Sequence, residues 1–181
     1  MPRPIVLALV LGYASIAFAD IAPTSDPPQT LERGDQLQAD LGLSVIQAAY
    51  EHRFGEHISA SLSAGVFGSY FLPWFGLGDN VIGIGGGVRA TWFARASGRG
   101  LYVAPYVRGH RVSGDHDGVH GTGLGFSAGA FVGWAIGLAD KLDLRVGAGA
   151  QFIEHYLNTA SGRATTQTPF IALDLVVAYR L

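Results

Sequence analysis

The segment Asn80 to Arg95, NVIGIGGGVRATWFAR, decides the fold class of this chain. Alternate residues of a β-strand point to opposite faces, and in this segment the two faces differ in chemistry. One face is apolar, whereas the other is small, polar or basic: Ile82, Ile84, Val88, Ala90 and Trp92 alternate with Gly83, Gly85, Gly87, Arg89, Thr91 and Arg95. Such a strand suits a wall between hydrocarbon and a narrow polar interior, which is the arrangement of a transmembrane β-barrel.

The same alternation continues on both sides of this segment, over residues 37–44, 46–54, 57–71, 101–112, 122–138, 141–155 and 169–181. Short connections (55–56, 96–100 and 139–140) alternate with longer ones (72–79, 113–121 and 156–168). Outer-membrane barrels have short periplasmic turns, longer external loops and an even number of strands. We therefore predict an all-β fold, an eight-stranded antiparallel up-and-down transmembrane β-barrel. No turn signal divides 37–54, so one long strand there, in a seven-stranded wall with an external leader, is the alternative.

Composition excludes several other classes of protein. The 181 residues suffice for one domain, and charged residues, at 14%, are scarce for a soluble surface. A net charge of −2 with only 12 basic residues offers no patch for nucleic acid. The chain has no cysteine, which excludes disulfides and thiolate metal sites, and we expect no cofactor.

The N-terminus predicts export. Met1 to Ala19 reads MPRPIVLALVLGYASIAFA, a basic residue and an apolar run that end in a small-x-small cleavage pattern. We predict a signal peptide over 1–19, cleaved after Ala19, and a flexible periplasmic leader rich in Pro, Ser, Thr and Asp over 20–36. The barrel then occupies 37–181, in the outer membrane of a Gram-negative bacterium.

The polar face of the strands decides which side faces lipid. A secreted lipocalin-like carrier would turn the apolar face inward and would need an exterior rich in Lys, Glu and Asp, whereas this face is mostly Gly, Ser and Ala. Small residues suit the crowded interior of an eight-stranded barrel. Charges on this face need partners, so we expect a structural network that fills the lumen, formed by Asp40, Glu51, Arg53, Arg89, Arg108, Asp143, Arg145 and Asp174.

Two further groups of residues are candidates for surface roles. Aromatic side chains gather at the headgroup level of barrels, and we expect this of Trp74, Phe75, Trp92, Trp134 and Tyr179. Loop 113–121 carries a compact set with metal-binding chemistry, Asp115, His116, Asp117 and His120. Because Asp and His are also common in turns, we interpret this set as a solvated external loop and predict no metal site.

Four segments resemble the small outer-membrane β-barrel families of Gram-negative bacteria: QAAYEHRFGEHISASLSAG (47–65), GLYVAPYVRG (100–109), GWAIGLADKLDLRVGAGAQF (133–152) and VVAYRL (176–181). The resemblance is to members of unknown function, with a barrel like that of outer-membrane protein A. Their Tyr-Glu pair corresponds to Tyr50-Glu51, and their Tyr-x-x-Pro-Tyr motif to Tyr102–Tyr106. It implies the fold and no activity. A departure is the final Leu181, where barrels commonly end in an aromatic residue.

The leading hypothesis is a non-catalytic outer-membrane barrel with a structural or surface-interaction role. Its expected partners are outer-membrane lipid, including lipopolysaccharide, and the barrel assembly machinery, and we expect a monomer. A narrow, porin-like pore for water or small ions is one alternative. Another is a membrane-edge hydrolase of lipid, but the one local candidate, His155, has Leu157 where such an enzyme would carry its serine, and neither Ser127 nor Ser161 is placed beside a base by the sequence.

Overall fold

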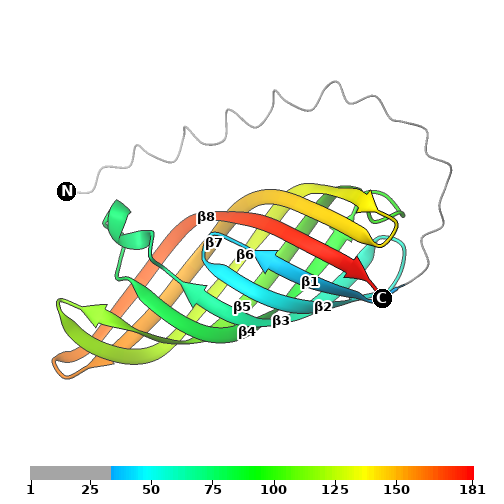
Figure 1. Cartoon of the computed structure of the whole chain (residues 1–181). Helices are drawn as coiled ribbons and strands as arrows, with labels where there is room; N and C mark the ends of the chain where they lie inside the picture. Colours follow the sequence, from blue (N-terminus) through cyan, green and yellow to red (C-terminus); the bar gives the residue numbers. More distant parts are fainter. Residues whose placement is uncertain (1–33) are drawn as a thin grey trace.

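The computed structural model describes residues 34–181 as a closed barrel of eight antiparallel strands, each paired with the next and the first with the last (Figure 1). The eight strands are β1 (Gln36–Leu41), β2 (Val45–Arg53), β3 (Ile58–Gly68), β4 (Val81–Phe93), β5 (Gly100–His116), β6 (Val119–Ala139), β7 (Leu142–Thr159) and β8 (Gly162–Arg180). The eight-stranded prediction is confirmed, and residues 37–54 form two strands. The predicted signal peptide, its cleavage after Ala19 and most of the predicted leader lie outside the described residues.

A 3-10 turn, η1 (Leu72–Phe75), is the helical element of the described chain. Within residues 34–181, no helix is both long and apolar enough to cross a membrane.

The surface of the barrel is the inverse of a soluble protein's surface. Large apolar side chains on the outward face are strongly exposed, for example Ile84 at 69%, Leu62 at 67% and Ile46 at 66%. Charged side chains on the inward face are buried, with Glu51 at 0% and Arg145 at 2%. Exposed apolar area of this extent requires a hydrocarbon environment, so the closure with the apolar face inward, as in a lipocalin, is not adopted.

Both ends of the described chain lie at one end of the barrel, which we call the proximal end (Figure 1). Leu181 N–H donates to the carbonyl of Asp35 at 3.0 Å, and the short turns 54–57, 94–99 and 140–141 lie at this end. The other four connections lie toward the opposite, distal end. The sequence predicted the proximal position of these turns, but the predicted alternation of short and longer connections holds only for the β3–β4 connection, residues 69–80.

Two of the predicted distal loops are wrong, because the strands continue through them. β5 and β6 pair up to His116↔Val119, and β7 and β8 pair up to Thr159↔Gly162, so residues 113–121 and 156–168 are mostly strand. Asp117 and Gly118 both have positive φ, at 50° and 77°. This is the signature of a two-residue hairpin turn whose twist matches that of its strands. The result is a pair of tall hairpins that project beyond the rest of the barrel (Figure 1).

The strands β1 and β2 are much shorter than those of the tall hairpins, so the barrel wall is low where they lie. A membrane-spanning strand needs about 9–11 residues, whereas β1 has six. β8 pairs with β1 only from Arg180 to Val176, so the rest of β8 has no strand partner on that side within the described chain. We call the resulting opening, between β8 and β3 above the β1–β2 turn, the lateral gap.

The connection between β3 and β4, residues 69–80, folds across the lateral gap and the distal mouth. Phe71 stacks on Phe170 of β8, with ring centroids 4.7 Å apart. Gly78 lies so close to β8 that a Cβ on it would be 2.3 Å from Thr166 Cγ2. The fully buried Leu72 joins an apolar core in the distal half of the lumen: Val45, Phe67, Phe71, Val81, Val112, Ile153 and Leu157. This segment, the distal lid, therefore plugs the barrel with hydrocarbon side chains.

Candidate functional site: the charged lumen

Below the distal core, the lumen holds a network of buried ion pairs. Asp40 of β1 accepts a hydrogen bond from Arg108 Nη2 of β5 at 3.0 Å, and Arg89 Nη1 of β4 lies 3.6 Å from the same carboxylate oxygen. Arg89 also bonds Asp174 of β8, whose second oxygen accepts from Tyr102 Oη at 2.6 Å. Charges from four strands are thereby joined across the lumen.

A second pair lies nearer the proximal end. Arg145 of β7 donates to both oxygens of Glu51 on β2, at 2.7 and 2.8 Å, and to Gln36 Oε1 of β1 at 2.9 Å. This bidentate geometry is the strong form of an arginine–carboxylate interaction. Since both side chains are fully buried, the pair is costly to break by removing one partner.

The third group lies at the proximal mouth. Asp143 of β7 accepts hydrogen bonds from Arg180, from Nη2 to Oδ1 at 2.7 Å and from Nε to Oδ2 at 2.9 Å. Arg99 Nε lies 3.5 Å from Asp143 Oδ1. These arginines come from the last residue of β8 and from turn 94–99. Three layers of charge therefore follow one another along the axis.

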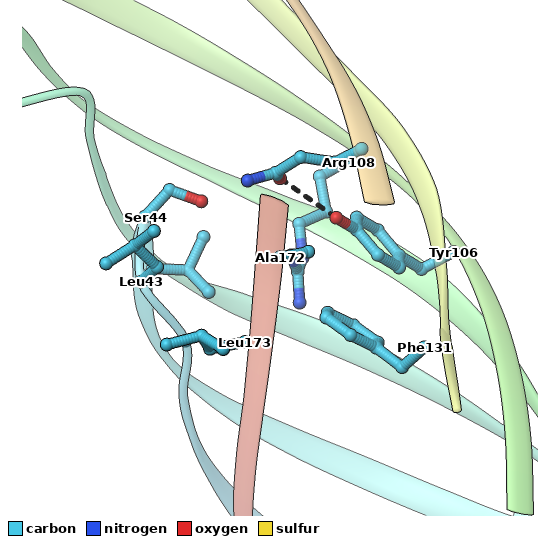
Figure 2. Close-up of a pocket in the computed structure, with 10 residues that line it drawn as sticks. Leu43, Ser44, Tyr106, Arg108, Phe131, Ala172 and Leu173 are labelled. Carbon is cyan, nitrogen blue, oxygen red and sulfur yellow. Dashed lines mark hydrogen bonds between the residues drawn. The ribbon is translucent and has the colours of Figure 1, made fainter. Parts of the chain in front are cut away.

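Aromatic rings separate these charges. Tyr106 stacks on Phe131 at 4.8 Å, and the guanidinium of Arg108 lies 4.1 Å from the Tyr106 ring. Tyr106 Oη donates to Gln151 Oε1 at 2.9 Å, the dashed contact of Figure 2. The predicted lumen network did not include these aromatic residues. The Tyr-x-x-Pro-Tyr spacing contained the signal, because residues four apart on a strand share a face.

A small hollow beside this cluster reaches toward the lateral gap (Figure 2). It is lined by the β1–β2 turn at Leu43 and Ser44, by Tyr106 and Arg108 inside the barrel, and by Leu173 of β8. Its empty space, open mouth included, is about 150 Å³, and no water molecule fits within it. The structure thus offers no cavity here for a substrate or a column of water.

All eight residues of the predicted lumen network lie inside the barrel, and seven of them form ion pairs: Asp40, Glu51, Arg89, Arg108, Asp143, Arg145 and Asp174. Arg53 does not. Its guanidinium lies 5.0 Å from the centroid of the Phe93 ring. Arg180, Arg99, Gln36 and Gln47 complete the network.

The five predicted interface aromatics divide between the two ends. Trp92, Trp134 and Tyr179 point outward from proximal strand segments, with exposed fractions of 47%, 37% and 48%. Trp74 and Phe75 are exposed on η1 in the distal lid. This distribution matches the two aromatic belts that flank a hydrocarbon band.

The four candidate metal ligands do not converge on one point. His120 Nδ1 lies 2.9 Å from Asp115, whereas His116 Nδ1 lies 2.8 Å from Asp79 of the distal lid and its Nε2 lies 3.6 Å from Asp117. Within the described chain no group of three or more His, Cys, Asp or Glu side chains is arranged to hold a metal ion. The hydrogen bond and the charge of Asp79 raise the pKa of His116 above its ordinary value.

The candidate hydrolase residues are also dispersed. His155 is 1% exposed and faces the lumen, without a hydrogen-bond partner for either ring nitrogen. Ser161 bonds Thr159 in a hairpin turn. Ser127 Oγ does lie 3.5 Å from His110 Nε2, but both are buried, and His110 stacks on Phe67 in the packed lumen. This arrangement leaves no room for a lipid ester.

At the proximal end, a hydrogen bond outside the lumen holds the start of β1. His52 Nδ1 lies 2.7 Å from Asp35. Hydrogen bonds from Tyr50 and His52 hold the pKa of the exposed Asp35 below its ordinary value.

Comparison with solved structures identifies the architecture. Neisserial surface protein A (NspA) superimposes with a TM-score of 0.55 at 14% sequence identity, over 81% of this chain and 94% of that protein's chain. At this identity the likeness concerns the fold, which is that of an eight-stranded up-and-down barrel. No protein-family model matches the sequence, and no curated protein does.

Proposed function

We propose that this chain is a non-catalytic β-barrel of the Gram-negative outer membrane, with a structural or surface-interaction role. The inverted surface, with apolar side chains outward and charge inward, supports the membrane assignment. The short turns and both described termini would face the periplasm, and the tall hairpins would face the exterior. A signal peptide cleaved after Ala19 would supply the export.

The observation that carries the proposal is the filled lumen. Three layers of ion pairs, the aromatic rings between them and the distal core occupy the interior in sequence along the axis. Solvent would have to displace buried, hydrogen-bonded charges to pass, and this costs several kcal/mol per pair. The network therefore favours a structural role over ion conduction.

The tall hairpins offer the surface for interaction. Beyond the apolar band their outward face carries polar and basic residues, including Arg111, Asn158, Arg163 and His120. This chemistry suits the anionic and hydroxyl groups of lipopolysaccharide. We also propose that the barrel assembly machinery inserts the chain, with Tyr179 in place of a terminal aromatic residue, and that the barrel acts as a monomer.

Planar-bilayer recordings on the purified, refolded protein test the structural role against the pore. We expect no discrete conductance steps, because the lumen is closed at three levels. Stepwise conductance in the wild type would favour the narrow pore. Washed outer-membrane fractions of the expressing cells should contain the protein, and its absence from them would contradict the location. A mass change of lipid A in those cells would favour the hydrolase.

A further inference from the structure

We propose that the proximal mouth of the barrel binds a small oxyanion, a carboxylate or a phosphate, at Arg53. This inference goes beyond the proposed function, because a structural barrel needs no ligand. It concerns the one residue of the predicted lumen network that the ion pairs leave out.

Arg53 is buried at the end of β2. Its exposed fraction is 7%, and its Nε is buried without a hydrogen-bond partner. Within residues 34–181 it forms no ion pair, whereas the equally buried Arg89, Arg108 and Arg145 each bond a carboxylate. The charges of Glu51 and Asp143 act on Arg53 without contacting it. A buried charge that lacks a hydrogen-bonded counter-ion is unfavourable, so the guanidinium of Arg53 can still gain from a direct anionic partner.

Two groups lie close to the guanidinium of Arg53. The Phe93 ring supports the guanidinium from one side at 5.0 Å. Gly98 of turn 94–99 also lies close, because a Cβ there would fall 1.4 Å from Arg53 Nη2 and 2.7 Å from Nη1. Gly98 also has a φ of 68°, which favours glycine. Arg53 is the last residue of β2, and its terminal nitrogens therefore lie at the proximal rim, beneath this turn.

The charge balance of the mouth favours an anion. Arg53, Arg99 and Arg180 bring three guanidinium groups to this end, and Asp143, which bonds Arg180 and lies beside Arg99, is the carboxylate buried among them. Glu51, two residues before Arg53, already accepts both bonds from Arg145. A planar guanidinium with free donors matches the two oxygens of a carboxylate or phosphate in a bidentate geometry.

Titration of the refolded mature chain in zwitterionic detergent tests the site. Inorganic phosphate and acetate are added separately at constant ionic strength, and the arginine side-chain N–H signals are followed by NMR. We expect a saturable shift of the Arg53 signal with a dissociation constant on the order of millimolar. Saturation by one probe alone assigns the site to that oxyanion, and saturation by both assigns the shared chemistry.

Three variants make the result specific. Arg53→Gln should weaken binding at least about tenfold, and Arg53→Lys, which keeps the charge but loses the bidentate donors, should weaken it severalfold. The matched control is Arg163→Gln, because Arg163 lies at the exposed distal tip over Tyr156, and binding should be unchanged. If Arg53→Gln fails to fold, the lysine variant and the wild-type titration still decide.

Several outcomes would overturn the proposal. They are a linear, non-saturating shift with both probes, an equal loss of binding in the Arg163→Gln control, or unaltered binding in Arg53→Lys and Arg53→Gln.

Discussion

At the scale of single residues, Asp174 is the hub of the central lumen. It is 1% exposed, bonds Arg89, and accepts from Tyr102 Oη at 2.6 Å. Removing its charge leaves Arg89 with Asp40 alone, which is 3.6 Å away and also serves Arg108. The buried positive charges would then outnumber their partners.

We predict that Asp174→Asn lowers the free energy of unfolding by about 3–5 kcal/mol, the range for breaking a buried ion pair by removing one partner. Urea unfolding of the protein in phospholipid vesicles measures the change. The control is Asp115→Asn, whose pair with His120 is 67% exposed on both sides. That variant should stay within about 0.5 kcal/mol of the wild type, and equal losses in both would contradict the argument.

A second residue-scale prediction concerns pH. His116 and Asp79 lie beyond the apolar band, and Asp79 raises the pKa of His116 through a 2.8 Å hydrogen bond and its charge. Because the folded pKa lies above the unfolded value of about 6.5, the pair stabilises the lid fully below that pH, and the contribution is lost as the pH rises through the raised pKa.

An NMR titration of the His116 ring measures this pKa. In Asp79→Asn it should fall toward the ordinary value, whereas Asp117→Asn should change it little, since Asp117 is 92% exposed and 3.6 Å away. A pKa of His116 that does not respond to Asp79→Asn would refute the role of this pair.

The sequence predicted the face of each charged residue but not its partner. Alternation places Arg89 and Asp174 on the inward side of their strands. Their contact, however, depends on how far each strand is staggered around the barrel, which is set by the register of every intervening pair. For the same reason nothing in the sequence distinguished Arg53, which lacks a carboxylate, from Arg145, which has one.

At the scale of elements, the distal lid depends on a close approach to β8. Its segment 69–80 has few backbone bonds to the barrel beyond Ser69, whose N–H donates to Val81 O at 2.9 Å. Instead, Phe71 and Phe75 pack on Phe170, and Gly78 lies against Thr166. A lid held by side-chain packing opens more readily than the strand ladder.

We predict that Gly78→Ala loosens the lid. The new Cβ would lie 2.3 Å from Thr166 Cγ2, at a φ of 153°, and strain of about 1–2 kcal/mol would raise the open population roughly tenfold. Limited digestion with chymotrypsin, which cleaves after aromatic residues such as Trp74, measures the change on protein held in vesicles. Gly55→Ala is the control, because a Cβ there meets nothing within 4 Å. Equal cleavage of the two variants would show that Gly78 does not hold the lid.

The alternation of apolar and polar residues did not predict how long β5 to β8 are. Inside the hydrocarbon band an outward residue must be apolar, so the two-residue period is visible in the sequence. Above the band both faces can be polar, as around His120 and Asn158, and the period disappears although the backbone ladder continues. The sequence therefore marks where a strand leaves the membrane rather than where it ends.

At the scale of the whole molecule, the strand ladder closes into a ring, and ion pairs across the lumen connect strands on opposite sides of the barrel. Glu51 with Arg145 links β2 to β7, and Asp40 with Arg108 links β1 to β5. Such cross-barrel pairs bond residues far apart in the sequence, so unfolding has to break them together with the ladder.

We predict that the mature chain keeps its fold in cold dodecyl sulfate and migrates differently on a gel before and after boiling. The physical reason is that the ladder closes into a ring, so the detergent has to break the pairing of β1 with β8 before it can separate the strands, and the part of β8 beyond this pairing lies against the distal lid. Identical migration of the two samples would contradict the closed ring.

Because β1 is short, its pairing with β8 is the weakest contact between neighbouring strands of the barrel. β1 and β8 meet over five ladder pairs, against eighteen between β7 and β8. Deuterium uptake by backbone amides should therefore begin along β1 and spread to β2, while β6 and β7 stay protected longest. The cylinder would then part along a single line and unroll as a curved ribbon. By the same reasoning, the pairing of β1 with β8 would be the last to form during insertion.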